Sequence, residues 1–154
     1  MEQSTMYITL RNYFLAGNPA APLDQLWKLA VDADESVRRR VAENPAAGEH
    51  LLRLLYIDQS ADVRIAVAEN PSCPQDLIQH LVNDKNDDVR FAIAENPNVA
   101  LEVLAALSED ENPFVSERAK RTISRIEPPD REPADSPAAL LSIIRDCIAP
   151  TNSG

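Results

Sequence analysis

The chain has 154 residues, which is enough for one domain whose hydrophobic core needs no disulfide or metal to hold it. It carries 25 acidic residues against 15 basic ones, a formal net charge of −10, and no basic segment that would attract nucleic-acid phosphates. The two cysteines cannot form the disulfide framework of a small secreted protein, so we expect a cytoplasmic protein. No apolar run approaches the roughly 18 residues that a membrane span needs, so we expect no membrane partner.

The first expected element is a cap helix over residues 6–16, with Tyr7, Leu10, Tyr13 and Phe14 as its apolar side chains. From residue 15 to residue 107 the sequence then repeats itself with a period of 26 residues. The triplet Glu-Asn-Pro begins at Glu43, Glu69 and Glu95, and Gly17-Asn18-Pro19 stands one period earlier. With only 3 glycines against 12 prolines, this pattern favours helices separated by prolines over a β-rich fold.

Each 26-residue unit is interpreted as two short helices. In the second unit the first helix is expected over residues 47–57, where leucines recur at helical spacing. The second helix buries Val63, Ala66 and Val67 and must stop at Asn70, because the residue before a proline is pushed out of the α region. Its N-cap position holds side chains that can accept a hydrogen bond from the first turn: Asp34, Ser60, Asn86 and Asn112. Two such short helices cannot bury their apolar faces alone, so the units should stack.

The end of the chain departs from the period. Ala119-Lys120-Arg121 replaces Val-Ala-Glu, and a charged outer face is what a C-terminal cap requires. Beyond it, prolines and acidic residues indicate a linker, and an apolar stripe before Pro150 indicates one more helix. We therefore expect a helical-repeat domain over residues 1–127, a Pro-rich acidic linker over 128–136 and a C-terminal amphipathic helix over 137–149.

The repeated motif resembles the leucine-rich repeat variant family, a branch of the HEAT-like α-solenoids. It is carried by Asp58, by Val63-Arg64 and by the run Val67-Ala68-Glu69-Asn70-Pro71, and it covers about residues 15–127. The resemblance implies an all-α fold: a right-handed α-solenoid of about four 26-residue two-helix repeats with N- and C-terminal cap helices, in which one helix of each pair can be short or 3₁₀-like. Some members hold an iron–sulfur centre on an N-terminal cysteine cluster; this chain has no such cluster, and no cofactor is expected.

When the 26-residue units are aligned with one another, residues at equivalent positions form columns. Several of these columns are predicted to have a structural role. In HEAT-like stacks an Asp at the turn and an Arg on the second helix commonly pair between neighbouring repeats. The Asn side chains can satisfy backbone groups that are freed at a helix end, and the alanines of the Ala42 column permit close helix approach. The structural ladder is predicted to comprise Asp32, Asp58, Asp84, Asp110, Arg38, Arg64, Arg90, Asn18, Asn44, Asn70 and Asn96.

The remaining columns supply the candidate binding site. On a helical wheel Ile65 and Glu69 lie opposite Val63 and Val67, facing solvent. If the second helices line the concave surface, as the HEAT resemblance implies, these columns form an apolar groove flanked by stacked carboxylates. The alternative is that Ile65 and Phe91 pack between units and the glutamates are merely solvated. The candidate protein-binding residues are Arg39, Glu43, Ile65, Glu69, Phe91 and Glu95.

No nucleophile elbow, Gly-rich phosphate loop or zinc signature is present, and His50 and His80 stand in different columns, so we expect neither a metal site nor an enzyme. The chain is interpreted as a non-catalytic interaction module or scaffold that binds a basic or amphipathic peptide or protein segment on an acidic, partly apolar concave face. One alternative is a regulatory solenoid whose C-terminal helix occludes the groove. A less favoured one is a HEAT-like enzyme such as a DNA glycosylase or chromophore lyase; for the DNA-directed type the acidic groove is unsuited.

Overall fold

The computed structural model describes the backbone of residues 2–126 and the side chains of residues 6–126. Every regular element in this range is an α-helix, which confirms the all-α class: α1 (Glu2–Ala16), α2 (Leu23–Leu29), α3 (Glu35–Ala42), α4 (Glu49–Leu55), α5 (Ala61–Glu69), α6 (Gln75–Leu81), α7 (Asp87–Glu95), α8 (Leu101–Leu107) and α9 (Pro113–Ile126). The expected linker over 128–136 and the expected helix over 137–149 lie outside the described residues.

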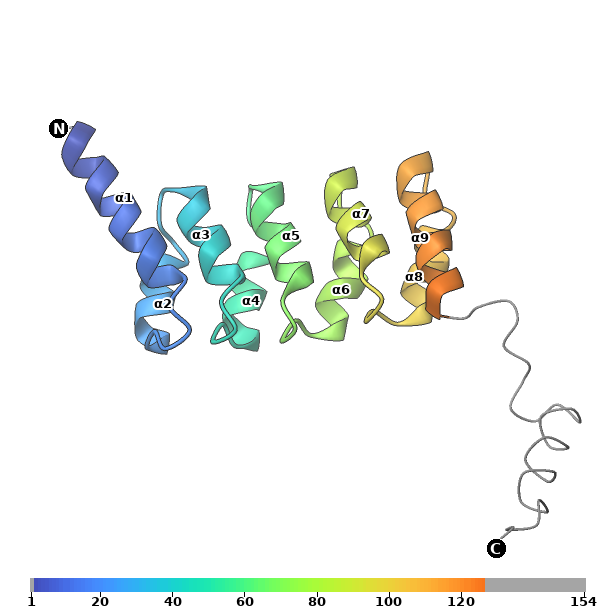
Figure 1. Cartoon of the computed structure of the whole chain (residues 1–154), viewed down its shortest axis with the longest axis horizontal. Coiled ribbons are helices and arrows are strands. Elements are labelled where there is room, and N and C mark those ends of the chain that lie inside the picture. The colour runs from blue at the N-terminus through green and yellow to red at the C-terminus, as the bar shows by residue number, and fades with distance from the viewer. Residues whose placement is uncertain (1, 127–154) are drawn as a thin grey trace, which may run out of the picture.

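The helices form two layers (Figure 1). The odd-numbered helices lie side by side in chain order, each packed against the next, and the seven-residue even-numbered helices line the other side of the molecule. Each 26-residue unit contributes one helix to each layer, so corresponding side chains fall in line along the row. Apolar side chains between the layers form one core, in which Leu26, Leu52, Val63, Val67 and Leu104 have no exposed surface.

The ends of the odd-numbered helices follow from their capping residues. Asp34 Oδ1 accepts the backbone N–H of Ser36 at 2.9 Å, and Asn112 Oδ1 accepts that of Phe114 at 2.9 Å. The prediction for Ser60 is wrong in one respect, because its side chain caps nothing. In every unit an aspartate two residues earlier accepts the backbone N–H of the N-cap residue; Asp58 Oδ1 accepts that of Ser60 at 2.9 Å and fixes the turn before α5.

Helix lengths differ from the sequence expectation at two places. The helix expected over 47–57 is limited to Glu49–Leu55, because Gly48 is extended as its N-cap and Tyr56 closes it as the C-cap. The N-terminal helix begins at Glu2, before the expected residue 6, and runs for 15 residues. The even-numbered helices are short but α-helical. Within the described residues, every helix is too short or too polar to cross a membrane.

Candidate functional site

Ion pairs join each of α3, α5 and α7 to the turn before the next odd-numbered helix, at the N-terminal ends of these helices. Arg64 is 5% exposed, and its Nε and Nη2 donate to Asp84 Oδ2 and Oδ1 at 2.6 and 2.8 Å. Its Nη1 donates to the carbonyl oxygen of Asp58 at 2.7 Å. Burial alone would raise the pKa of Asp84, but the bonds from Arg64 and the backbone N–H of Asn86 outweigh burial and lower that pKa.

The same ion pair recurs along the row. Arg38 bonds Asp58 at 2.7 and 2.9 Å, and Arg90 bonds Asp110 at 2.7 and 3.1 Å. The Asp32 column begins differently, since Asn12 Nδ2 of α1 donates to Asp32 Oδ2 at 2.8 Å. The aspartates and arginines of these columns therefore fix the register between neighbouring helices, and their role is structural.

Asparagines bind the opposite ends of the same helices together. Asn70 is buried; its Nδ2 donates to the carbonyl oxygens of Ala42 and Asn44 at 2.7 and 3.2 Å. Asn44 makes the equivalent pair of bonds to Ala16 and Asn18 at 2.6 and 2.9 Å. Asn18, at the start of the column, accepts the N–H of Ala20 at 2.9 Å.

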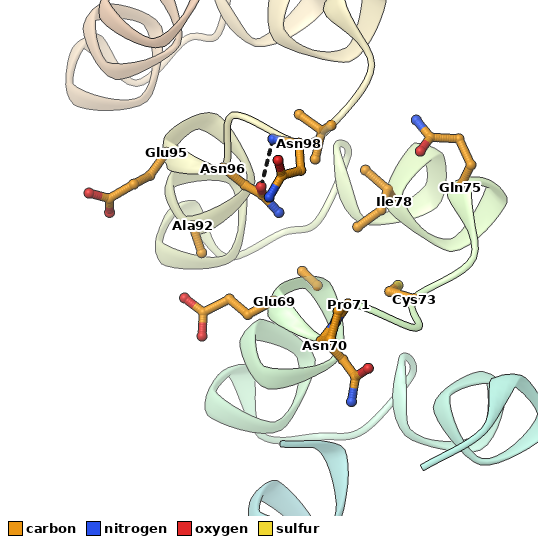
Figure 2. A pocket seen from close by; sticks show the side chains of 12 residues that line it. Glu69, Asn70, Pro71, Cys73, Gln75, Ile78, Ala92, Glu95, Asn96 and Asn98 are labelled. Atoms are coloured by element: carbon orange, nitrogen blue, oxygen red, sulfur yellow. Dashed lines mark hydrogen bonds between the residues drawn. The ribbon is translucent and has the colours of Figure 1, made fainter. Parts of the chain in front are cut away.

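The asparagine series stops between α5 and α7. Asn96 Oδ1 accepts the backbone N–H of Asn98 at 2.9 Å, as Figure 2 shows, but its Nδ2 donates no hydrogen bond to the described residues of α5. Asn96 is half-buried, whereas Asn44 and Asn70 are buried. The junction between α5 and α7 is therefore less tightly closed at this end than the two junctions before it.

A row of carboxylates runs across the solvent-facing side of the odd-numbered helices. Glu43, Glu69 and Glu95 stand at the ends of α3, α5 and α7 and are exposed. Half-buried side chains lie beside them in the neighbouring column: Arg39, Ile65 and Phe91. We call these six residues the carboxylate face. Neither Ile65 nor Phe91 is in the interior, although both pack against the core from its edge.

Arginine covers the first carboxylate. Arg40 Nη1 donates to Glu43 Oε2 at 2.9 Å, and the guanidinium lies 5.5 Å from the centroid of the Tyr13 ring on α1. Arg39 also approaches Glu43, at 3.2 Å. Gly17 leaves the space that Arg40 uses, since a Cβ there would overlap Arg40 Nε.

Arginine covers the third carboxylate in a related way. Arg118 on α9 reaches back to α7, where its Nη1 lies 3.5 Å from Glu95 Oε1 and its guanidinium 5.0 Å from the centroid of the Phe91 ring. Arg118 and Arg40 belong to one column of the 26-residue period, and the two positions between them hold Ala66 and Ala92. The column thus reads Arg, Ala, Ala, Arg from α3 to α9.

Glu69 is the carboxylate without an arginine. Within the described residues it forms no ion pair, and a pocket of about 360 Å³ opens beside it between α5 and α7. Figure 2 shows Glu69 and Glu95 projecting on the same side of this pocket, with Ala92 between them. Partial burial raises the pKa of Glu69, and the nearby charges of Glu43 and Glu95 raise it further.

The carboxylate face continues into a hollow at α9 that has both apolar and charged walls. This pocket of about 640 Å³ is lined by the apolar side chains of Phe91, Pro113 and Phe114 and by the charged side chains of Glu117, Arg118 and Arg121, and Phe114 is 76% exposed. Acidic and apolar surface therefore adjoin across α5, α7 and α9. This combination suits a ligand that carries both a cation and an apolar group.

Sequence reasoning named the carboxylates but missed what covers them. The structure brings Glu43, Glu69 and Glu95 close enough to raise the pKa of the middle one, and it places Ile65 and Phe91 beside them. The covering roles of Arg40 and Arg118, and the pocket at Ala92, were not anticipated. The signal was present in the sequence as the run Arg, Ala, Ala, Arg at positions 26 residues apart.

The Cys73 thiol beside this site is not activated. Cys73 lines the same pocket, and burial raises its pKa to about 11, so it stays protonated at neutral pH. Comparison of the chain with protein-family models, with curated proteins and with solved structures finds no match.

Proposed function

We propose that the chain is a non-catalytic protein-interaction module that binds a basic, arginine-containing segment across the carboxylate face. In this proposal the two helical layers are a cytoplasmic, right-handed α-solenoid of about four repeats, of the leucine-rich repeat variant type, and the carboxylate face is its concave side. The 26-residue period and the two-layer packing support the solenoid. The observation that carries the binding function is Glu69, an unpaired carboxylate beside an open pocket.

The chain's own arginines indicate how a partner would bind. Arg118 lies on the Phe91 ring and reaches Glu95, and one unit earlier Ile65 and Glu69 occupy the equivalent positions. There, Ala92 stands where Arg118 would. An arginine from a partner can fill that space, with its guanidinium on Glu69 and its aliphatic stem on Ile65.

Electrostatics favours a cation at this position over a neutral group. Glu43, Glu69 and Glu95 repel one another, and a cation beside Glu69 relieves that repulsion, whereas a second anion would add to it. Arginine suits the site better than lysine, because its planar guanidinium offers a fork of donors to two carboxylates at once. Because the carboxylates are exposed, salt should weaken the binding.

The adjoining hollow at Phe91 and Phe114 adds an apolar requirement. Neighbouring packed helices lie about 8–10 Å apart, a distance that an extended peptide spans with about three residues. An apolar side chain about three residues from the arginine can therefore reach the hollow. We infer that the preferred partner segment is amphipathic, with arginine and an apolar residue separated by one helix spacing.

A peptide pair tests this proposal. The first is a fluorescein-labelled peptide of repeated Arg-Ser-Ser-Leu units, and the second carries citrulline, the neutral isostere of arginine, at each arginine position. Fluorescence anisotropy with the full chain should give a Kd at least tenfold lower for the arginine peptide, a difference of about 1.4 kcal/mol. Equal affinities for the two peptides would contradict the proposal.

Variants locate the binding. Glu69→Gln removes the unpaired charge, and Ala92→Arg fills the pocket with a side chain that the fold already accommodates at Arg40 and Arg118. Each should weaken binding of the arginine peptide about tenfold. The matched control is Glu102→Gln, which removes an exposed carboxylate from α8 in the other layer and should leave Kd unchanged. Unchanged binding to Ala92→Arg would show that the peptide binds elsewhere.

A further inference from the structure

Backbone carbonyl oxygens where the odd-numbered helices end bind a carboxamide side chain at two junctions of the row. Asn44 Nδ2 donates to the carbonyl oxygens of Ala16 and Asn18 at 2.6 and 2.9 Å. Asn70 Nδ2 donates to those of Ala42 and Asn44 at 2.7 and 3.2 Å. The last carbonyls of a helix have no partner within the helix, so a side-chain donor is needed there. The fold thus contains a carbonyl pair that is shaped to take both hydrogens of one NH₂ group.

The next carbonyl pair of this series, on Ala68 and Asn70, has a donor position open. Both residues are 5% exposed. Among the described residues nothing donates to the Ala68 carbonyl oxygen, because the N–H of Ser72 bonds Asn70 Oδ1 at 2.8 Å instead. The Asn70 carbonyl oxygen accepts one bond, from the Cys73 N–H at 2.8 Å, and can accept a second. Buried carbonyl oxygens are normally paired, so this pair favours a further donor.

Larger side chains separate α5 from α7 at this end and keep Asn96 from filling the position. The turn position that holds a buried alanine in the first two units, Ala21 and Ala47, holds Cys73 and Val99 in the next two. Both of these larger residues line the pocket of about 360 Å³, and Asn96 lines it as well. Figure 2 shows Asn96 on the α7 side of this pocket, with α5 opposite. A donor and an acceptor pair therefore face a space that neither closes.

We propose that this pocket binds a carboxamide side chain of the partner, from an asparagine or glutamine next to the arginine that binds Glu69. Its nitrogen donates to the carbonyl oxygens of Ala68 and Asn70, as the chain's own asparagines do at the two earlier junctions. Its oxygen accepts Asn96 Nδ2 from the other wall. Because Ala68 and Asn70 flank Glu69 in the sequence, the carboxamide and the arginine are neighbours in the partner. The inference rests on the proposed function, since one segment supplies both groups.

Other polar groups match this pocket less well. A carboxylate offers no hydrogen to the two carbonyl oxygens, and Glu69 and Glu95 repel it. A hydroxyl offers one hydrogen for two acceptors, and an ammonium group or a guanidinium leaves Asn96 Nδ2 without an acceptor. A carboxamide supplies two donors and an acceptor without charge, which is the complement of the groups that line the pocket.

Two peptides test the carboxamide. Both consist of repeated, fluorescein-labelled Arg-Gln-Ser-Leu units, and in the second each glutamine is dimethylated on its side-chain nitrogen, which removes both donors and keeps the oxygen. Fluorescence anisotropy with the full chain should give a Kd about tenfold lower for the unmodified peptide, because the modified one loses two hydrogen bonds. Equal Kd values overturn the inference. A difference between arginine and citrulline peptides would still stand in that case, so the failure of this inference is distinguishable from failure of the proposed function.

The Cys73 thiol reports whether the carboxamide occupies the pocket, because Cys73 lines it. In Cys147→Ser, the unmodified peptide at saturation should slow the reaction of Cys73 with iodoacetamide at least tenfold more than the dimethylated peptide at saturation does. Equal protection by the two peptides places the carboxamide elsewhere and overturns the inference.

A pair of asparagine variants completes the test. Asn96→Ala removes the donor to the carboxamide oxygen and should weaken binding of the unmodified peptide about threefold. The matched control is Asn83→Ala, which changes an exposed asparagine in the turn after α6 and should leave Kd unchanged. Equal effects of the two variants contradict the assignment of Asn96 as a donor to the partner.

Discussion

Replacing Arg64 by methionine should be among the most destabilising single changes in the described part of the chain. The side chains of Arg64 and Asp84 are 6% and 8% exposed, and the pair is joined by two hydrogen bonds. Arg64→Met keeps the aliphatic stem but leaves Asp84 with only the backbone N–H of Asn86, at 2.9 Å. It also leaves the Asp58 carbonyl oxygen without its donor.

Removing one partner of a buried ion pair costs about 3–5 kcal/mol, because the other charge stays buried without compensation. Asp84 keeps one hydrogen bond, so we expect the lower end of that range, about 3 kcal/mol, in a domain whose total stability is of order 5–15 kcal/mol. Urea denaturation followed by circular dichroism measures the loss as a lower midpoint with a similar slope.

The control has the same chemistry but is exposed. Arg53 bonds Asp76 at 2.6 and 3.0 Å, with side chains that are 38% and 50% exposed. Since water solvates both groups, Arg53→Met should leave the midpoint nearly unchanged. If Arg64→Met shifts the midpoint no more than Arg53→Met does, then burial does not give the ladder its importance and the reasoning fails.

Three further predictions follow from the same contacts. Asn70→Ala should cost about 1–3 kcal/mol, because the Ala42 carbonyl oxygen loses the bond from Asn70 Nδ2 and the Asn44 carbonyl oxygen keeps only the bond from the Ala47 N–H. Asn96→Ala should cost less, because Asn96 makes no bond to α5; equal midpoint shifts would show that the asparagine series does not hold the helices together. The pKa of Asp110 is lowered below its ordinary 3.8, chiefly by the hydrogen bond from Arg90, and those of Asp58 and Asp84 are also lowered, since their bonds outweigh burial. These carboxylates therefore stabilise the fold fully above pH 3.8, and that contribution is lost as the pH falls through their folded pKa values. The urea midpoint should decrease in that acid range. A midpoint that stays constant there would show that these ion pairs do not stabilise the fold. Cys73, with a pKa of about 11, should react with iodoacetamide at pH 7 about a hundredfold more slowly than an ordinary thiol of pKa 9.0. The rate is measured in the Cys147→Ser variant, in which Cys73 is the remaining thiol. A rate equal to that of an ordinary thiol would show that Cys73 is not shielded.

Much of the fold could be predicted because the same 26-residue pattern occurs about four times in the sequence. Asn-Pro fixes where α5 and α7 end, and leucines three and four residues apart fix which side of α4 is buried. Ser60 shows the limit of such reasoning. A serine at an N-cap position is a good acceptor, yet the Ser60 side chain accepts nothing from the first turn, whereas Asp34, Asn86 and Asn112 at the equivalent positions do.

The candidate site was only partly accessible from sequence. The wheel placed Glu69 and Ile65 on the solvent side, since that follows from helical periodicity within one unit. The covering of Glu43 and Glu95 depends on how far Arg40 and Arg118 reach, and on which neighbouring helix they reach toward. Arg40 binds Glu43 at the end of its own helix, whereas Arg118 on α9 reaches Glu95 on α7, the preceding odd-numbered helix. Such choices depend on the packing between helices, which a helical wheel does not contain.

The raised pKa of Glu69 is the most direct probe of the binding proposal. Its charged form is disfavoured in the free protein by burial and by Glu43 and Glu95, so a guanidinium beside it must lower its pKa. The Glu69 carboxyl carbon should be titrated by ¹³C NMR with and without a saturating amount of the arginine peptide. We predict that the peptide moves the Glu69 midpoint to lower pH and that the citrulline peptide does not. A Glu69 midpoint that the bound arginine peptide leaves in place would contradict the proposal that this carboxylate receives the cation.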